Sequence, residues 1–137
     1  MKVGIIGSGG REHALCVSLR KSTKISEIYC FPGNAGTSSI ATNINLQTND
    51  FEELKDFVKK KEIDIIIVGP EKPLVDGIVD FLENNQIKVF GPNKIASQLE
   101  GSKIFTKNLC KKYNIPTANF GIFQNIDDAE QFLKETK

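Results

Sequence analysis

Near its start the chain reads KVGIIGSGGREHA, residues Lys2–Ala14. A buried strand is expected over Lys2–Ile6, which contains the β-branched residues Val3, Ile5 and Ile6, and it ends in a loop with glycines at positions 7, 9 and 10. Glycine lets a backbone turn tightly and come close to a ligand. A helix is expected over Gly10–Lys21, and its first N–H groups would point at the same loop. This order of strand, glycine loop and helix predicts an anion site, and phosphate is its usual occupant.

Short apolar runs and helical stretches continue to alternate downstream. Further strands are expected at residues 27–31, 43–46, 63–68 and 88–90, and further helices at 50–61 and 73–84. Asp50 is the expected N-cap of its helix, with Glu53 as the capping-box partner. Ala14, Leu15 and Leu19 are expected on the inner face of the first helix. Strands that alternate with helices at this spacing indicate βαβ units, so the fold class is α/β with a mostly parallel sheet.

The pattern changes after Gly91-Pro92. Helices are expected at 95–99 and 103–113, and a strand at 118–123 precedes a further helix at 127–134. These last elements have no evident partners in the sequence, so we expect them to begin a second domain. The predicted division is residues 1–101 and residues 102–137.

Composition and charge exclude several classes of protein. The 137 residues carry 18 basic and 17 acidic side chains, a net charge of +1. This balance gives no field that would attract nucleic acid or an anionic membrane. No apolar run approaches the roughly 18 residues needed to span a bilayer, so a cytoplasmic location is expected. Cys16, Cys30 and Cys110 are odd in number and far apart in sequence, which favours reduced thiols over disulfides or metal ligands.

Three loops carry the candidate site residues, and each follows a predicted strand. They are Gly7–His13, Pro32–Thr37 and Gly69–Leu74. Loops at the carboxyl ends of parallel strands share one edge of the sheet, so these loops are expected to line one cleft. Arg11 and Glu12 beside a phosphate site indicate a ligand that combines a phosphate with an amine or hydroxyl. Glu71 is placed to bind ribose hydroxyls or an amine, whereas His13 is expected to be a packed or capping residue.

A dinucleotide site is the main rival interpretation. Its fingerprint is G-x-G-x-x-G followed by a carboxylate about 20 residues later. In this chain the fingerprint would require a third glycine at position 12. Position 12 is Glu12, and the second predicted strand ends in Phe31-Pro32-Gly33 without a carboxylate. A dinucleotide-dependent oxidoreductase is therefore disfavoured.

Taken in order, these loops resemble the phosphoribosylamine–glycine ligase (glycinamide ribonucleotide synthetase) family. The matching motifs are Gly7–Ala14, Pro32–Gly36, Val68–Glu71, Pro73-Leu74, Gly77, Phe90–Pro92, Leu99–Lys103, Phe105, Lys107 and Ile115–Ala118. The ordered set is specific and covers nearly all of the chain. The resemblance implies a doubly wound, Rossmann-like (pre-ATP-grasp) domain that binds phosphoribosylamine over residues 1–101. Over residues 102–137 it implies a linker and the beginning of an ATP-grasp domain.

The resemblance also implies a reaction and its site residues. The family ligates glycine to 5-phosphoribosylamine with ATP, through a glycyl phosphate, and gives glycinamide ribonucleotide, ADP and phosphate in de novo purine biosynthesis. By position, the substrate-binding residues would be Gly9, Gly10, Arg11, Glu12, Gly33, Asn34, Gly69, Pro70 and Glu71. Lys103 would contact the nucleotide phosphates. No catalytic residue and no metal ligand is expected within these 137 residues.

Enzymes of this family are much longer than 137 residues. ATP and Mg²⁺ or Mn²⁺ are therefore expected to bind mainly in ATP-grasp domains outside this sequence, and the chain alone is expected to be inactive. Two alternatives stay open. One is a stand-alone phosphoribosyl- or nucleotide-binding module without catalysis, and the other is a formate-using or carboxylating ATP-grasp ligase of purine synthesis.

Overall fold

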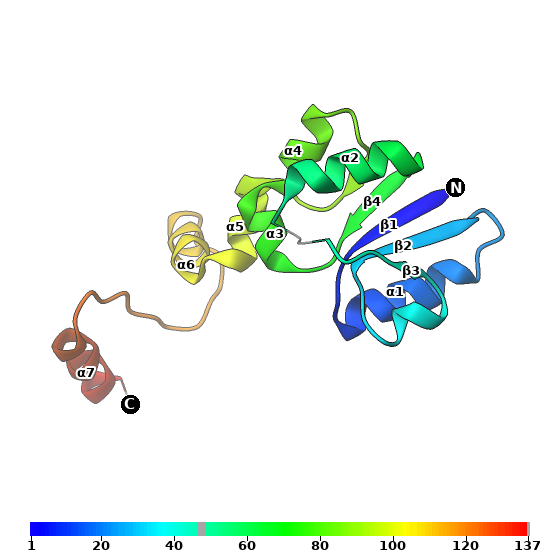
Figure 1. Ribbon diagram of the computed structural model, residues 1–137. Helices are drawn as coiled ribbons and strands as arrows, with labels where there is room; N and C mark the ends of the chain where they lie inside the picture. Colours follow the sequence, from blue (N-terminus) through cyan, green and yellow to red (C-terminus); the bar gives the residue numbers. More distant parts are fainter. Residues whose placement is uncertain (47–48, 137) are drawn as a thin grey trace. The chain divides into compact units, whose positions relative to one another are not determined.

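The computed structural model describes residues 1–46 and 49–136, in two compact units, Met1–Ser97 and Gln98–Lys137. The first unit contains a five-stranded sheet with the order β3-β2-β1-β4-β5 (Figure 1). The strands are β1 (Lys2–Gly7), β2 (Glu27–Pro32), β3 (Thr42–Asn43), β4 (Ile65–Val68) and β5 (Val89–Phe90). Every neighbouring pair is parallel, so the predicted α/β class with a parallel sheet is confirmed.

Helices cover both faces of this sheet. They are α1 (Gly10–Arg20), α2 (Phe51–Lys61), α3 (Glu71–Asp76), α4 (Ile78–Asn84) and the short 3₁₀ turn η1 (Thr37–Ser39). Helix α5 (Lys94–Gly101) follows β5 in the chain. Figure 1 shows α2 and α4 on one side of the sheet and α1 on the other. On the first side Ile6, Phe31 and Ile66 pack with α2 and α4. On the second side Ile5 and Cys30 pack with α1, which confirms a doubly wound architecture.

Helix α2 begins where the sequence predicts. The Asp50 side chain accepts a hydrogen bond from Glu53 N at 3.0 Å and so satisfies one of the free N–H groups of the first turn. The ring of Phe57 then meets Tyr29 and Phe31 edge-on, with centroids 5.9 and 5.5 Å apart. A capped start and an aromatic anchor together fix this helix on the sheet.

Four details differ from the sequence predictions. The expected helix 73–84 is two helices, because Gly77 adopts φ 101° between them. The third strand covers only Thr42–Asn43. On α1, Ala14 is exposed, because the buried side chains of this helix are those of Glu12 and Cys16, which lie four residues apart on one face. Leu15 and Leu19 are half-buried beside this face. The fourth difference, at residues 118–123, belongs to the second unit.

The second unit contains α6 (Lys103–Lys112) and α7 (Ile126–Glu135). Ser102 and Asn125 cap these helices with side-chain oxygens that accept from Phe105 N and Asp128 N. The strand predicted at 118–123 is wrong, because the described residues of this unit offer no neighbouring strand with which it could form a ladder. Across the described ranges, no helix is both long and apolar enough to cross a membrane.

Candidate functional site

Three loops leave the sheet at one edge. The last residues of β1 and β2 pair as Gly7↔Pro32, and those of β1 and β4 pair as Ile6↔Val68. The β1–α1, β2–η1 and β4–α3 loops therefore begin side by side. The direction of winding reverses between β1 and β4, and α/β sheets bind ligands at such a switch point.

Glu12 fills the space directly behind the first glycine loop. Its side chain is 3% exposed, and its Oε2 accepts a hydrogen bond from Gly9 N at 2.5 Å. A Cβ at Gly7 would lie 2.7 Å from Glu12 Cδ, and one at Gly9 would lie 2.8 Å from Oε2. A Cβ at Gly69, in the β4–α3 loop, would overlap with Glu12 Oε1. Glycines from two loops thus form a socket for this carboxylate, a use of glycine that sequence reasoning missed.

Gly10 differs from the other glycines of the loop. A Cβ added there would meet nothing within 4 Å. Gly10 is also the first residue of α1, where the backbone N–H groups of the first turn have no intrahelical partners. Open space beside the Gly10 Cα and the free N–H groups expected at a helix start are two features that a phosphate site needs.

Asn34 ties the β2–η1 loop to the glycine loop. Its Nδ2 donates to Ser8 O at 2.8 Å and to Gly9 O at 3.1 Å. Its Oδ1 accepts from Thr37 N at 3.0 Å, and its own N donates to Thr37 Oγ1 at 2.8 Å. Asn43 adds a further bond, from Nδ2 to Asn34 O at 2.8 Å. The network holds the two loops at a fixed distance from each other.

Arg11 and Glu71 form an ion pair across the switch point. Arg11 Nη2 lies 2.9 Å from Glu71 Oε1, and the two side chains are 65% and 42% exposed. Exposed ion pairs contribute about 0–1 kcal/mol to stability. A ligand phosphate can therefore compete for the guanidinium, and a ligand hydroxyl or amine for the carboxylate, at small cost.

A hollow of about 490 Å³ opens at this edge of the sheet. Its lining comes from all three loops and their neighbours, namely Gly7, Ser8, Gly9, Pro32, Asn45, Leu46, Asn49, Pro70, Lys72, Pro73 and Asp76. Ser8 and Lys72 belong to loops that the sequence predicts to line one cleft, whereas Asp76 lies outside these loops and was missed. Lys72 and Asp76 lie four residues apart on α3 and form an ion pair at 2.8 Å. A predicted helix that began at Glu71 would have placed Asp76 on the same helix face as the loop residue Lys72.

Of the remaining predicted residues, some line the hollow and others contact neighbouring loops within the protein. Pro70 lines the hollow, whereas Gly33 adopts φ 76° and donates from N to Gly7 O at 3.1 Å. The His13 ring lies against Gly36, where a Cβ would come within 2.7 Å of its Cε1. This placement is that of a packed residue, as predicted for His13.

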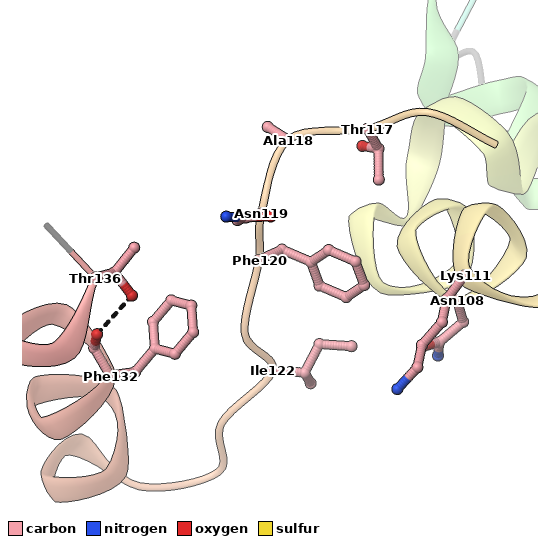
Figure 2. Close-up of a pocket in the computed structure, with 9 residues that line it drawn as sticks. All are labelled: Asn108, Lys111, Thr117, Ala118, Asn119, Phe120, Ile122, Phe132 and Thr136. Atoms are coloured by element: carbon pink, nitrogen blue, oxygen red, sulfur yellow. Dashed lines mark hydrogen bonds between the residues drawn. The ribbon is translucent and has the colours of Figure 1, made fainter. Parts of the chain in front are cut away.

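Lys103 lies in the second unit, exposed at the first position of α6. This unit has a hollow of its own, of about 570 Å³. Figure 2 shows Phe120 and Ile122 pointing from the connecting segment toward α6, and Phe132 pointing from α7 toward the same segment. Lys111 is the charged residue in its lining. Two of the predicted site residues, Gly9 and Pro70, line the hollow in the first unit, whereas Arg11, Glu12, Asn34 and Glu71 are not among its lining residues.

Comparison with known proteins decides the family. Residues 1–100 match the family described as "Phosphoribosylglycinamide synthetase, N domain". The chain belongs to this family. Among relatives in the family, phosphoribosylamine–glycine ligase of Caldanaerobacter subterraneus subsp. tengcongensis is 49% identical over 136 residues. The match covers 99% of this chain and 33% of the relative. The ligase of Clostridium acetobutylicum is 46% identical over 98% of this chain and 32% of its own length.

Solved structures agree with this assignment. The crystal structure of phosphoribosylamine–glycine ligase from Thermotoga maritima matches with a TM-score of 0.71 and 31% identity. That match covers 100% of this chain and 31% of the Thermotoga chain. N5-carboxyaminoimidazole ribonucleotide synthetase from the same organism has a TM-score of 0.71 at 22% identity, which shows a shared fold alone. The chain thus spans about a third of the length of its relatives in the family.

Proposed function

We propose that this chain forms the phosphoribosylamine-binding part of an ATP-dependent ligase that joins glycine to 5-phosphoribosylamine. The observation that carries the proposal is the Arg11–Glu71 pair, which spans the switch point in a chain of this family. A phosphoribosylamine offers a phosphate at one end and hydroxyls and an amine at the other. Arg11 supplies a cation for the phosphate, and Glu71 supplies an anion for the hydroxyls or the amine.

Each predicted site residue has a role in this proposal. Gly10 N–H and the Arg11 guanidinium bind the phosphate, because a helix start and an arginine both favour a phosphate oxygen. Glu71 accepts from ribose hydroxyls or the amine. Gly9 and Pro70 line the hollow, Gly33 joins the β2–η1 loop to the end of β1, Gly69 makes room for Glu12, and Glu12 and Asn34 hold the glycine loop.

The nucleotide belongs to a different part of the proposal. We assign residues 1–101 to phosphoribosylamine binding and residues 102–137 to the beginning of an ATP-grasp domain, with Lys103 contacting nucleotide phosphates. The ranges 1–46 and 49–136 contain no group of three His, Cys, Asp or Glu side chains that could hold a metal. We assign the metal no ligand among these residues and propose that ATP and Mg²⁺ or Mn²⁺ bind mainly in the ATP-grasp part of the ligase. A cytoplasmic location fits a ligase that uses ATP.

Titration calorimetry with glycinamide ribonucleotide, the product, tests the proposal. The 137-residue chain is expected to bind it, and Glu71→Ala is expected to weaken binding about 10-fold, the effect of losing a hydrogen bond to a charged group. Glu52→Ala is the matched control, because Glu52 also belongs to an exposed ion pair, with Lys55 on α2. Equal affinity in Glu71→Ala and the unchanged chain would contradict the role of Glu71. A folded chain that does not bind the product at all would contradict the proposal itself.

A further inference from the structure

Glu12 is a buried carboxylate with one oxygen unsatisfied. The side chain is 3% exposed. Its Oε2 accepts from Gly9 N at 2.5 Å, whereas Oε1 has no hydrogen-bond partner among the described residues. The bond from Gly9 N is a capping-box bond at the start of α1, which explains Oε2 but leaves the buried Oε1 without a partner among the described residues.

The position of this carboxylate is unusual for an α/β sheet. The socket formed by Gly7, Gly9 and Gly69 lies where β1 and β4 end. In dinucleotide-binding sheets a glycine at the position of Glu12 leaves the helix close to the strand, and the pyrophosphate rests on the helix start. Here the side chain of Glu12 occupies the crevice between the same two strands.

We infer that Glu12 is a specificity-determining positioning residue, which closes the β1/β4 crevice to a diphosphate and leaves the glycine loop able to bind a single phosphate group. The inference rests on the proposed function in one respect, namely that the loop binds phosphate at all.

Two physical effects support this exclusion. The first is loss of a donor, because Oε2 already accepts from Gly9 N and that amide is not available to a ligand. The second is charge, because a diphosphate in the crevice would lie beside a carboxylate in surroundings that screen charge poorly. A single phosphate avoids both effects at Gly10, where an added Cβ would meet nothing within 4 Å, and at Arg11, whose side chain is 65% exposed.

Calorimetry with two probes, inorganic pyrophosphate and ribose 5-phosphate, tests the inference on the whole 137-residue chain. Glu12→Gly restores the glycine spacing of the dinucleotide fingerprint and empties the socket, so pyrophosphate is expected to bind at least about 10-fold more tightly than to the unchanged chain. Glu12→Gln keeps the side-chain volume and removes the charge, so a smaller gain of about 3-fold is expected. Ribose 5-phosphate affinity is expected to change less than pyrophosphate affinity in both variants.

Several results would overturn the inference. One is that the unchanged chain and a folded Glu12→Gly variant bind pyrophosphate with the same affinity, or that neither of them binds it. If Glu12→Gly does not fold, Glu12→Gln decides the matter, and an unchanged pyrophosphate affinity overturns it. A merely structural role for Glu12 would lower stability without altering the ratio of the two affinities. Failure of ribose 5-phosphate to bind the unchanged chain would contradict the proposed function, and the pyrophosphate comparison would still report on Glu12.

Discussion

At the scale of single residues, Asn34 shows how a predicted ligand contact can serve the protein itself. Its Nδ2 group donates to two carbonyls of the glycine loop, and its Oδ1 accepts from Thr37 N. The amide is thus engaged on both sides within the protein. We interpret Asn34 as a residue that positions the loop rather than one that binds the ligand directly.

Asn34→Asp is expected to weaken binding of glycinamide ribonucleotide, because the aspartate keeps the acceptor for Thr37 N and loses the two donations to Ser8 O and Gly9 O. The free energy of unfolding is expected to fall by about 1–3 kcal/mol, because each of the two lost hydrogen bonds contributes about 0.5–1.5 kcal/mol. Calorimetry and urea denaturation measure the two effects. Asn34→Ala removes the acceptor for Thr37 N as well and should also lower the free energy of unfolding. Stability equal to that of the unchanged chain in both variants would show that the network does not hold the loop.

The two buried thiols give a second residue-scale prediction. Cys16 and Cys30 are free, with Sγ atoms 3.3 Å apart, as expected for reduced core cysteines. Burial is the main cause that raises the pKa of both thiols, and it raises the pKa of Cys30 from 9.0 to about 12. The folded protein therefore keeps the Cys30 proton at pH values at which the unfolded chain loses it.

The stabilising effect of the protonated Cys30 is present in full below pH 9 and is lost as the pH rises toward 12. Over this window the free energy of unfolding should fall by up to about 1.4 kcal/mol per pH unit for this thiol. Urea denaturation at a series of pH values measures the slope, and Cys30→Ala, which lacks the titrating group, should give a shallower one. The same slope in the variant would contradict the assignment to Cys30.

At the scale of elements, the sequence predicts those that have local signals. The cap at Asp50 and the alternation of strands with helices are such signals, and the structure confirms both. The break at Gly77 has no comparable signal, because a glycine inside an apolar helical pattern is tolerated and does not by itself indicate a break. The strand predicted at 118–123 depends on a neighbouring strand, which periodicity cannot reveal.

The break between α3 and α4 leads to a prediction about Gly77. Its φ of 101° lies in the left-handed region, where an L side chain is strained. Gly77→Ala should therefore lower the free energy of unfolding by about 1–2 kcal/mol. Gly10→Ala is the matched control, because Gly10 has no positive φ and an added Cβ there meets nothing within 4 Å. Equal stability of the two variants in urea denaturation would show that Gly77 does not require glycine.

At the scale of the whole molecule, the three site loops could be predicted and their internal contacts could not. Parallel strands bring their carboxyl ends to one edge, so the sequence order of the loops was enough to place Arg11 near Glu71. The burial of Glu12 depends on glycines from two loops 60 residues apart in sequence, such as Gly9 and Gly69. Such a socket follows from three-dimensional packing, which no local pattern of residues encodes.

The two units differ in how much of each is buried. All of the buried core residues lie within Met1–Ser97, and no residue between 98 and 136 reaches the same degree of burial. Apolar side chains such as Ile104, Ile126 and Leu133 are 56%, 75% and 70% exposed. Since burial of apolar surface is the main source of stability, the first unit should resist opening far more strongly than the second.

Hydrogen exchange measured by mass spectrometry tests this difference. Amides of β1 and β4 should exchange only through global unfolding, whereas those of α6 and α7 should exchange through local opening that costs much less free energy. Leu54→Ala is an internal control, because Leu54 is 2% exposed in the core and its truncation costs about 2–5 kcal/mol. This variant should speed exchange in the sheet and leave α7 unchanged. Protection of α6 and α7 equal to that of β1 would mean that residues 98–136 share the stability of the core, against what their exposure predicts.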